Sequence, residues 1–358
     1  MPFTLYVDAT RWRSHLRALT ERYPGLVPVV KGNGYGLGIS RLAAEASRLD
    51  VDTVAVGTAE EGPEVAATFG GDVLVMDPHR PAVAPVGQEC DVATERLVHT
   101  VADLSSLRAL TASGRRQRLV LEPLTSMRRH GLAEADLVVC RQLLDGPSQA
   151  GVQLEGIALH LPLRRPGDSA AAVAEVAHWL AAFRRAGLPC DQAWVSHLAA
   201  DELSELCGQH PAVTLRPRIG TDLWLGDRTA LEARGSVIDV HPLRAGDCYG
   251  YRQRRARRPG HLVVVAGGTA HGVGMEAPKA VRSARDRAQI LAAAALGAGG
   301  YALSPFSWAG RRRWYAEPPH MQVSMLLLPA SVPPPAIGAE LECTVRMTTT
   351  YFDRVVER

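Results

Sequence analysis

The first two-thirds of the chain alternate between short apolar runs, often β-branched, and longer segments with apolar residues at helical spacing. Short apolar runs bounded by polar residues indicate buried strands, and a period near 3.6 residues indicates amphipathic helices. Strands are predicted at residues 27–30, 53–56, 73–76, 97–101, 118–121, 155–159, 193–196 and 213–216. Helices are predicted at residues 10–23, 40–49, 59–68, 104–112, 134–144, 169–186 and 201–208.

Eight strands that alternate with helices favour an α/β fold of the (β/α)8 TIM barrel type. A doubly wound open sheet is the alternative. The glycine fingerprint that opens a helix after the first strand of such a sheet is missing from this sequence. The closed barrel is therefore the preferred prediction.

Beyond about Leu231, proline and glycine become frequent, and short alternating runs at residues 236–240, 261–265, 321–328 and 340–347 replace the helical pattern. One alanine-rich helix is predicted at residues 280–296, and the prolines of residues 331–338 predict a stiff connection. These features indicate a second, mostly β domain. We predict a barrel at residues 8–232 and a β domain that consists of residues 233–358 and the N-terminal strand at residues 1–7.

Composition narrows the classes of protein that fit. Hydrophobic residues make up 46% of the 358 residues, which is ample material for packed cores, and the net charge of +3 gives no reason to expect nucleic acid as a partner. The arginine clusters at residues 252–258 and 311–313 lack interleaved stacking aromatics, so a solvated hairpin and loop is the preferred interpretation.

The cysteines and the N-terminus bear on the cellular compartment. The six cysteines lie far apart and form no CxxC pair, which indicates reduced thiols rather than disulfides or a metal site. No signal-like segment opens the sequence, and no apolar run approaches the length of a membrane span. We expect a soluble cytoplasmic protein without a membrane or metal partner.

Ionisable residues stand where several predicted strands end. Lys31 follows the first strand, Glu122 ends the fifth, His160 the sixth and His197 the seventh, and Arg216 and Arg218 follow the eighth. In a barrel, the loops after the strands converge on one opening, where chemistry occurs. These side chains are therefore candidates for one shared site.

The stretch Val-Pro-Val-Val-Lys-Gly-Asn-Gly-Tyr-Gly-Leu-Gly at residues 27–38 is the most specific motif. A lysine where a buried strand meets a loop is desolvated, which lowers its pKa and suits a nucleophile or base. The glycines after it permit positive φ and close approach of a ligand, and Tyr35 offers a hydroxyl.

This stretch resembles the cofactor-lysine motif of the alanine racemases, which are fold-type III enzymes dependent on pyridoxal 5'-phosphate (PLP). The resemblance implies that Lys31 is covalently linked to PLP and that Tyr35 contacts the cofactor. The plain alternative is a strand-end lysine that reaches solvent beside a flexible loop.

The resemblance extends to three further segments. Residues 121–131 are similar to the segment whose arginine contacts the cofactor and the substrate carboxylate, and this arginine is Arg129 here. Glu122 stands where many members have a carbamylated lysine. A carboxylate at that position could orient Arg129. His160 matches the histidine beside the cofactor ring. Arg218 matches the arginine that faces the pyridine nitrogen, and the amides near Gly220 and Thr221 match the phosphate site.

An arginine at the ring nitrogen bears on the reaction type, because its pKa is too high for it to give up a proton. The cofactor would then be a weaker electron sink than one paired with a carboxylate, which suits reversible proton transfer at Cα more than loss of CO2. Arg216, two residues earlier, is the alternative inward-facing arginine.

The motif after the seventh strand departs from the family. Where the family has His-x-x-Asn-Ser, with the serine on the phosphate, this chain has His197-Leu-Ala-Ala-Asp201. We expect His197 near the cofactor. An aspartate beside a phosphate would be repulsive. We therefore expect Asp201 to turn away as the N-cap of the next helix, and the alternative is that the cofactor is bound differently.

A second departure concerns the second base. Racemases of this family use a tyrosine of the partner subunit in a Gly-Tyr-x-Asp-Gly motif, whereas this chain has Gly-Thr269-Ala-His271-Gly. A threonine is a very poor base, so His271 is the candidate replacement, ahead of Cys248, Tyr249 and His320. Met325 and Tyr351 resemble the family's substrate-side methionine and phosphate-side tyrosine.

These features predict a PLP-dependent amino-acid racemase-like isomerase that transfers a proton at Cα, with Lys31, Arg129 and His271 as catalytic residues. Its substrate would be a small-molecule amino acid, and the resemblance implies a homodimer with shared active sites. Because Thr269 replaces the tyrosine, a non-racemising decarboxylase, aldolase or eliminase is one alternative. A catalytically silent PLP-binding relative is the other.

Overall fold

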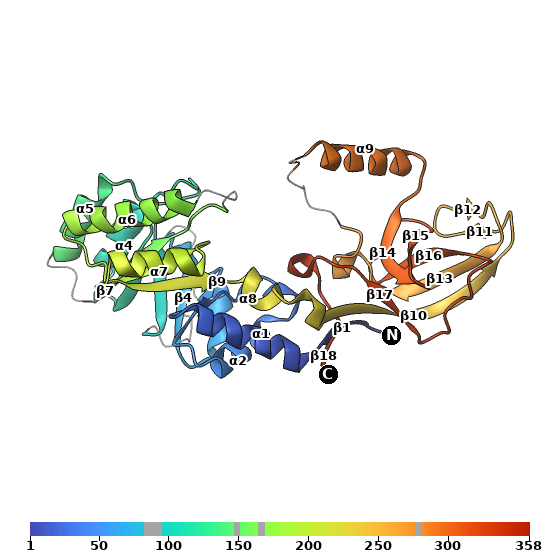
Figure 1. Cartoon of the computed structure of the whole chain (residues 1–358), viewed down its shortest axis with the longest axis horizontal. Helices are drawn as coiled ribbons and strands as arrows, with labels where there is room; N and C mark the ends of the chain where they lie inside the picture. Colours follow the sequence, from blue (N-terminus) through green and yellow to red (C-terminus); the bar gives the residue numbers. More distant parts are fainter. Residues whose placement is uncertain (82–94, 147–150, 164–168, 276–280, 282) are drawn as a thin grey trace. The chain divides into compact units, whose positions relative to one another are not determined.

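The computed structural model describes residues 1–81, 95–146, 151–163, 169–275, 281 and 283–358 (Figure 1). The chain divides into two compact units. One contains Met1–Trp12 and Asp227–Arg358, and the other contains Arg13–Gly226.

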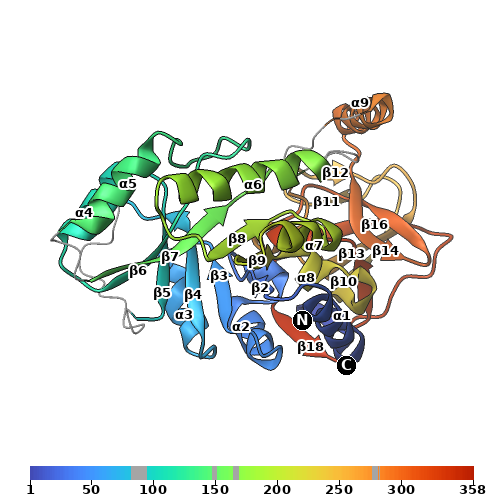
Figure 2. The same ribbon diagram turned by 60° about the vertical axis from the view of Figure 1, so that its left-hand side comes forward.

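The unit Arg13–Gly226 is built around a sheet of eight parallel strands in the order β2-β9-β8-β7-β6-β5-β4-β3 (Figure 2). A parallel bridge between Val29 and Ala55 joins the two ends of this order, so the sheet closes into the predicted barrel. The strands are β2 (Val27–Pro28), β3 (Thr53–Val56), β4 (Asp72–Pro78), β5 (Leu97–Val101), β6 (Gln117–Leu121), β7 (Val152–Leu159), β8 (Gln192–Ser196) and β9 (Thr214–Ile219).

Helices follow the strands in the predicted alternation. They are α1 (Ala9–Arg22), α2 (Ile39–Arg48), α3 (Gly62–Ala66), α4 (Leu104–Ala112), α5 (Asp136–Asp145), α6 (Ser169–Arg185), α7 (Ala200–Gln209) and α8 (Thr221–Leu225). All seven predicted helices are confirmed, although the third begins as a short 3-10 turn, η2 (Ala59–Glu61). The sequence pattern did not reveal α8, a single helical turn after β9.

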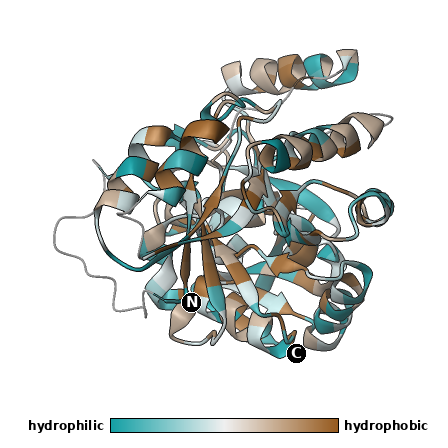
Figure 3. Cartoon of the chain, turned by 90° about the vertical axis from the view of Figure 1, so that its left-hand side faces the viewer, coloured by the Kyte–Doolittle hydropathy of each residue, from teal (hydrophilic) through white to brown (hydrophobic). Residues whose placement is uncertain are grey.

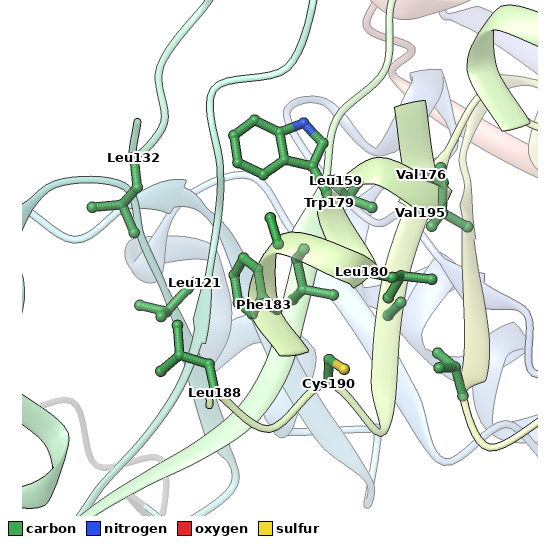
Figure 4. Close-up of a cluster of buried hydrophobic side chains, with 14 of the residues drawn as sticks. Leu121, Leu132, Leu159, Val176, Trp179, Leu180, Phe183, Leu188, Cys190 and Val195 are labelled. Carbon is green, nitrogen blue, oxygen red and sulfur yellow. The ribbon is translucent and has the colours of Figure 1, made fainter. Parts of the chain in front are cut away.

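Two apolar layers hold the barrel together. Inside it, buried small and apolar residues from β2 to β8 and from Val29 just past β2 fill the interior, including Ala55 and Trp194. Outside it, α6 packs Val176, Leu180 and Phe183 against Leu159 and its neighbours (Figure 4). The strands are accordingly apolar along most of their length (Figure 3), as expected when both faces of a parallel sheet are buried.

The other unit is an antiparallel β structure. Pairings join β10, β13, β16, β15, β14 and β17 into a closed ring, and β1 and β18 extend from β10. The strands are β1 (Phe3–Val7), β10 (Leu231–Leu243), β13 (Gly260–Ala266), β14 (Leu303–Trp308), β15 (Arg311–Tyr315), β16 (Val323–Pro329), β17 (Glu340–Cys343) and β18 (Arg354–Glu357). Because β1 pairs with β18 in parallel, the first and last strands of the chain lie side by side (Figure 1). The mostly β character that we predicted is confirmed.

The two arginine clusters lie in hairpins. A small antiparallel pair, β11 (Cys248–Tyr249) and β12 (Arg254–Arg255), contains part of the first cluster. The second begins β15, after a turn that joins it to β14, so it is strand rather than loop. Arg313 is buried and donates to the Trp308 carbonyl, a role that the charge pattern alone did not suggest.

The alanine-rich helix is α9 (Ala284–Ala298), and none of its side chains is buried. The start predicted at residue 280 lies outside the described residues. Five cysteines are free thiols, and Cys90 also lies outside the described residues. Over the described ranges, none of the helices has both the length and the apolar character required to cross a membrane, and no group of three or more side chains suited to a metal ion occurs.

Candidate active site at the barrel mouth

Lys31 lies just past β2, at the carboxyl end of the barrel strands, as predicted. The residues before it are buried, and Val30 donates its N–H to the Ala55 carbonyl at 2.7 Å. After it, the glycine-rich turn requires glycine at residue 34. Its φ is +58°, and a Cβ there would lie 2.6 Å from the Ile39 nitrogen. The motif therefore shapes a tight turn directly after the lysine.

The short helix α8 fixes the strand that carries Lys31. Trp224 is fully buried, and its indole N–H donates to the Val29 carbonyl at 2.8 Å. This bond satisfies a backbone acceptor two residues before Lys31, where β2 has already ended. This role of Trp224 could not be predicted from the sequence pattern.

Glu61 is a second residue that sequence reasoning missed. Its carboxylate accepts the Gly32 N–H at 2.6 Å, the Gly57 N–H at 2.7 Å and the Thr58 N–H at 3.3 Å. It therefore ties the turn after Lys31 to the turn after β3. Charge-assisted bonds of this kind are stronger than neutral ones, so Glu61 helps to fix the position of the lysine.

We expect Glu61→Gln to lower the free energy of unfolding by about 1–3 kcal/mol, because the amide cannot accept from all three donors. Unfolding of the whole chain in urea, followed by tryptophan fluorescence, measures this change. Glu60→Gln is the matched control, since Glu60 is the exposed neighbour on the same turn. Equal stability of the two variants would refute the role given to Glu61.

The two arginines of β9 serve opposite ends of the barrel. Arg218 is buried and donates to the Leu159 carbonyl, at the end of β7, at 3.0 Å. Arg216 instead pairs with Asp52, which precedes β3, and donates to Thr53 at 2.9 Å. Arg218 is thus the arginine at the mouth, and the alternative that gave this place to Arg216 is wrong.

His160 and His197 lie together at the ends of β7 and β8, with their ring centroids 5.4 Å apart. The His160 Nδ1 is 3.3 Å from the Ser196 hydroxyl, and its carbonyl accepts a hydrogen bond from Thr125 at 2.6 Å. Burial, with the charges of Arg218 and Arg129 next, lowers the pKa of His160 to about 3. The ring is therefore neutral at ordinary pH.

That shift has a consequence for stability. An unfolded histidine takes up a proton near pH 6.5, whereas His160 in the folded chain does not until about pH 3. The stability that His160 provides is present above pH 6.5 and is lost as the pH falls toward 3.

We expect His160→Gln to reduce the slope of the unfolding free energy against pH, measured between pH 6.5 and 3, by up to about 1.4 kcal/mol per pH unit. An unchanged slope in His160→Gln would contradict the assignment.

Glu122 and Arg129 lie in the loop after β6, as predicted, but a histidine stands between them. Arg129 donates from Nε to the His130 Nε2 at 3.0 Å, and the His130 Nδ1 lies 3.4 Å from a Glu122 oxygen. Glu122 is buried, and burial raises its pKa to about 7 against the opposing charges of Arg218 and Arg129. His130 thus lies between Glu122 and Arg129, and the direct pair that we predicted between these two residues is not among the described contacts.

The side chains at the mouth act on one another electrostatically. Desolvation is the main cause of the lowered pKa of Lys31, followed by the charge of Arg129, while Glu61 opposes the shift. Arg218 also contributes to this shift. A lowered pKa increases the fraction of neutral amine, which is the form that acts as nucleophile or base.

The Tyr35 hydroxyl borders a glycine cradle. Tyr35 is buried, and a Cβ at residue 220 would collide with its hydroxyl oxygen. Only glycine at this position lets the backbone of Gly220 and Thr221 approach the hydroxyl. Burial raises the pKa of Tyr35, so the hydroxyl keeps its proton and can donate it to an anionic oxygen.

The expected role of Asp201 is wrong. The N-cap of α7 is Ala199, and Asp201 lies exposed in the first turn. Glu202 supplies the capping contact instead, since its buried carboxylate accepts the Ala199 N–H at 2.6 Å. A carboxylate one residue farther into the turn can reach back to the free N–H of the cap, which explains the difference.

His271 belongs to the β unit and is engaged within it. Its Nδ1 accepts the Gly268 N–H at 3.2 Å, its Nε2 is 3.2 Å from an Asp353 oxygen, and its ring packs edge-on against Phe3. The ring is buried. With both nitrogens occupied, these contacts favour a structural role. Thr269 donates its N–H to the His320 carbonyl at 2.8 Å.

The remaining two predicted residues also lie in the β unit. Met325 is part of β16 and packs beside the small cluster around Tyr249 and Leu262. Tyr351 is exposed and donates its N–H to the His271 carbonyl at 3.3 Å. Their expected contacts with substrate and phosphate stay predictions.

The chain thus has a closed parallel barrel followed by a β domain. A lysine, arginines and histidines lie at the mouth of the barrel, as predicted for a barrel enzyme with an active-site lysine. Comparison with known proteins identifies the family. Residues 7–217 match the model of the alanine racemase N-terminal domain, which is more than half of the chain. The chain belongs to the alanine racemase family.

Individual relatives agree with this assignment. The alanine racemase of Nitratidesulfovibrio vulgaris strain DP4 is 28% identical over 264 residues, which is 68% of each chain. That of Symbiobacterium thermophilum is 33% identical over 162 residues, or 43% of this chain and 41% of its own.

Solved structures share the fold over nearly the whole length. Alanine racemase of Clostridium difficile 630 has a TM-score of 0.71 at 14% identity, covering 100% of this chain and 96% of its own. The Bartonella henselae enzyme, solved with covalently bound pyridoxal phosphate, has a TM-score of 0.68 at 17% identity and 100% coverage of both. These matches confirm the predicted barrel and β domain.

Proposed function

We propose that this chain is a PLP-dependent, amino-acid racemase-like isomerase that moves a proton at the substrate Cα. One observation carries the proposal: Lys31, with its lowered pKa, follows the barrel strand β2 at the mouth that also holds Arg129, His160 and Arg218. Family membership supports the cofactor and the reaction class. Residues 8–232 would form the cofactor domain, and residues 233–358 with 1–7 the β domain.

The donors at the mouth fit PLP. The cradle at Gly220 that a Cβ would fill, next to the Tyr35 hydroxyl, suits a phosphate. The Arg218 Nε is buried and has no hydrogen-bond partner among the described residues, so it can donate to a ring nitrogen. Lys31 is the amine for the covalent link. Tyr35, Gly220, Thr221, Arg218, His160 and His197 would hold the cofactor.

When bound, PLP supplies the electron sink that stabilises negative charge at the substrate Cα. Arg218 stays charged and keeps its protons, so it stabilises rather than protonates its neighbour. Arg129 binds the substrate carboxylate and orients the Cα–H bond. The Lys31 amine accepts or returns the proton on one face of Cα.

The contacts of His271 favour a second candidate function. A racemase needs a proton-transfer group on each face, and His271 is held by Asp353 and Gly268 inside its own unit. With Thr269 at the tyrosine position, an enzyme that exchanges or reacts on one face alone is the alternative. In keeping with the family resemblance, we propose a cytoplasmic homodimer in which Met325 and Tyr351 contribute to the shared sites.

Isotope exchange tests both candidates. The protein reconstituted with PLP is incubated in D2O with the L- and the D-form of an amino acid, and label at Cα is measured by mass spectrometry. Label in both enantiomers supports the racemase, label in one supports one-face chemistry, and loss of substrate without exchange indicates a lyase. A protein that takes up no PLP would refute every PLP-dependent function.

A further inference from the structure

The loop after β6 folds back over its own start. Glu122 donates its N–H to the Val101 carbonyl, and Leu132 returns to donate to the Glu122 carbonyl, both at 2.9 Å. Gly131 makes the return possible, because its φ is +144° and a Cβ there would overlap the Leu124 backbone. The two residues before this glycine, Arg129 and His130, are thereby brought back toward Glu122.

The outer part of the loop is fixed independently. Thr125 donates its hydroxyl to the His160 carbonyl at 2.6 Å, and the Ser126 hydroxyl donates to Glu175 of α6 at 2.6 Å. These contacts position the loop backbone but do not touch the Arg129 side chain. The guanidinium of an exposed arginine has many rotamers, so a separate contact is needed to orient it.

His130 provides that contact. The Arg129 Nε donates to the His130 Nε2 at 3.0 Å, and since arginine is never an acceptor, Nε2 must carry no proton. The ring proton is then on Nδ1, which is buried and faces a Glu122 oxygen at 3.4 Å. This separation is longer than a well-formed hydrogen bond. The described contacts include no direct hydrogen bond between Glu122 and Arg129.

We propose that His130 is the positioning residue through which buried Glu122 orients Arg129 toward the substrate carboxylate. This inference deepens the proposed function and rests on it, because it presumes that Arg129 binds substrate. Glu122 fixes the ring by favouring the Nδ1–H tautomer, and the free lone pair of Nε2 then holds the guanidinium. A histidine thus completes a contact that Glu122 does not make itself.

The surroundings keep the ring neutral. Burial is the largest cause of the lowered pKa of His130, followed by the charge of Arg129. The charged groups that face the ring are Glu122, Asp77, Arg80, Arg129 and Arg218. Protonation would replace the acceptor at Nε2 with a donor and release Arg129.

Two variants test the proposal in the holoprotein. His130→Leu removes the acceptor, so KM for the amino acid should rise about tenfold to a hundredfold, the loss expected of one hydrogen bond to a charged group. The visible absorbance of the lysine-bound cofactor should not change. His130→Gln keeps an acceptor oxygen and should restore KM to within a few-fold. An unchanged KM in His130→Leu, or loss of cofactor uptake with normal folding, would overturn the proposal.

A measurement on the cofactor-free protein separates this inference from the proposed function. Nitrogen NMR of labelled histidine should show His130 as the Nδ1–H tautomer. In Arg129→Gln, the apparent pKa of His130 should rise, because the neighbouring positive charge is gone. An Nε2–H tautomer or an unmoved pKa would refute the contact. If the wild-type protein takes up no PLP while this result holds, the proposed function fails but the His130 contact stands.

Discussion

Lys31→Ala is expected to abolish turnover and the visible absorbance of the lysine-bound cofactor. The variant removes both the amine that links PLP and the group that moves the proton on one face of Cα. We expect kcat to fall by at least about 10³-fold, since Lys31 is the only lysine among the residues that the structure describes. Absorbance spectra after reconstitution and a racemisation assay measure the two losses.

The chain offers an unusually clean control for this substitution. Its sequence contains two lysines, Lys31 and Lys279, and 38 of its 40 basic residues are arginine. Lys279→Arg should keep the absorbance and the activity of the wild type. Retention of the absorbance band in Lys31→Ala, or its loss in Lys279→Arg, would mean that the cofactor lysine is not Lys31.

Arg129→Gln is expected to lower kcat/KM by roughly 10²- to 10³-fold, which corresponds to about 3–4 kcal/mol. A charged partner for the substrate carboxylate is lost, and the orientation of Cα is lost with it. The cofactor absorbance should persist, because Lys31 and the glycine cradle are untouched. This separates the effect from that of Lys31→Ala.

Arg128→Gln is the matched control, since it removes the same charge one residue earlier. The substitution is the same, arginine to glutamine, and Arg128 has a φ of +52° in the wild-type backbone. Steady-state kinetics of the two variants with one amino acid decide the matter. Equal losses in both would show that overall charge at the mouth matters rather than a specific contact of Arg129.

The barrel could be predicted from the sequence because its signal is local. A strand buried on both faces is apolar throughout, so the runs at Thr53–Val56 and Leu97–Val101 mark their strands to the residue. Residues at strand ends follow from the same pattern, and Lys31, Arg129, His160 and Arg218 do come to one mouth. In the β unit, the alternating runs of the sequence fall on β10, β13, β16 and β17, whereas the arginine-bearing β15 has no comparable pattern.

The contacts that orient the site could not be predicted in this way. Glu61 reaches the Lys31 turn across 29 residues of sequence, and His130 reads as one more polar loop residue beside two arginines. Their roles depend on how loops fold back in three dimensions. The buried state of His271 likewise depends on Asp353, 82 residues away in the sequence. Residue type alone therefore gave His271 a catalytic role that its contacts do not favour.

Chemical reduction followed by peptide mapping tests the central claim most directly. Borohydride reduction of the PLP-reconstituted protein converts the cofactor link into a stable pyridoxyl group, whose position is then found by mass spectrometry of the digested chain. With two lysines in the sequence, the possible answers are few. We predict the pyridoxyl mass on the peptide that contains Lys31. The same mass on the Lys279 peptide, or on neither, would contradict the assignment of Lys31 as the cofactor lysine.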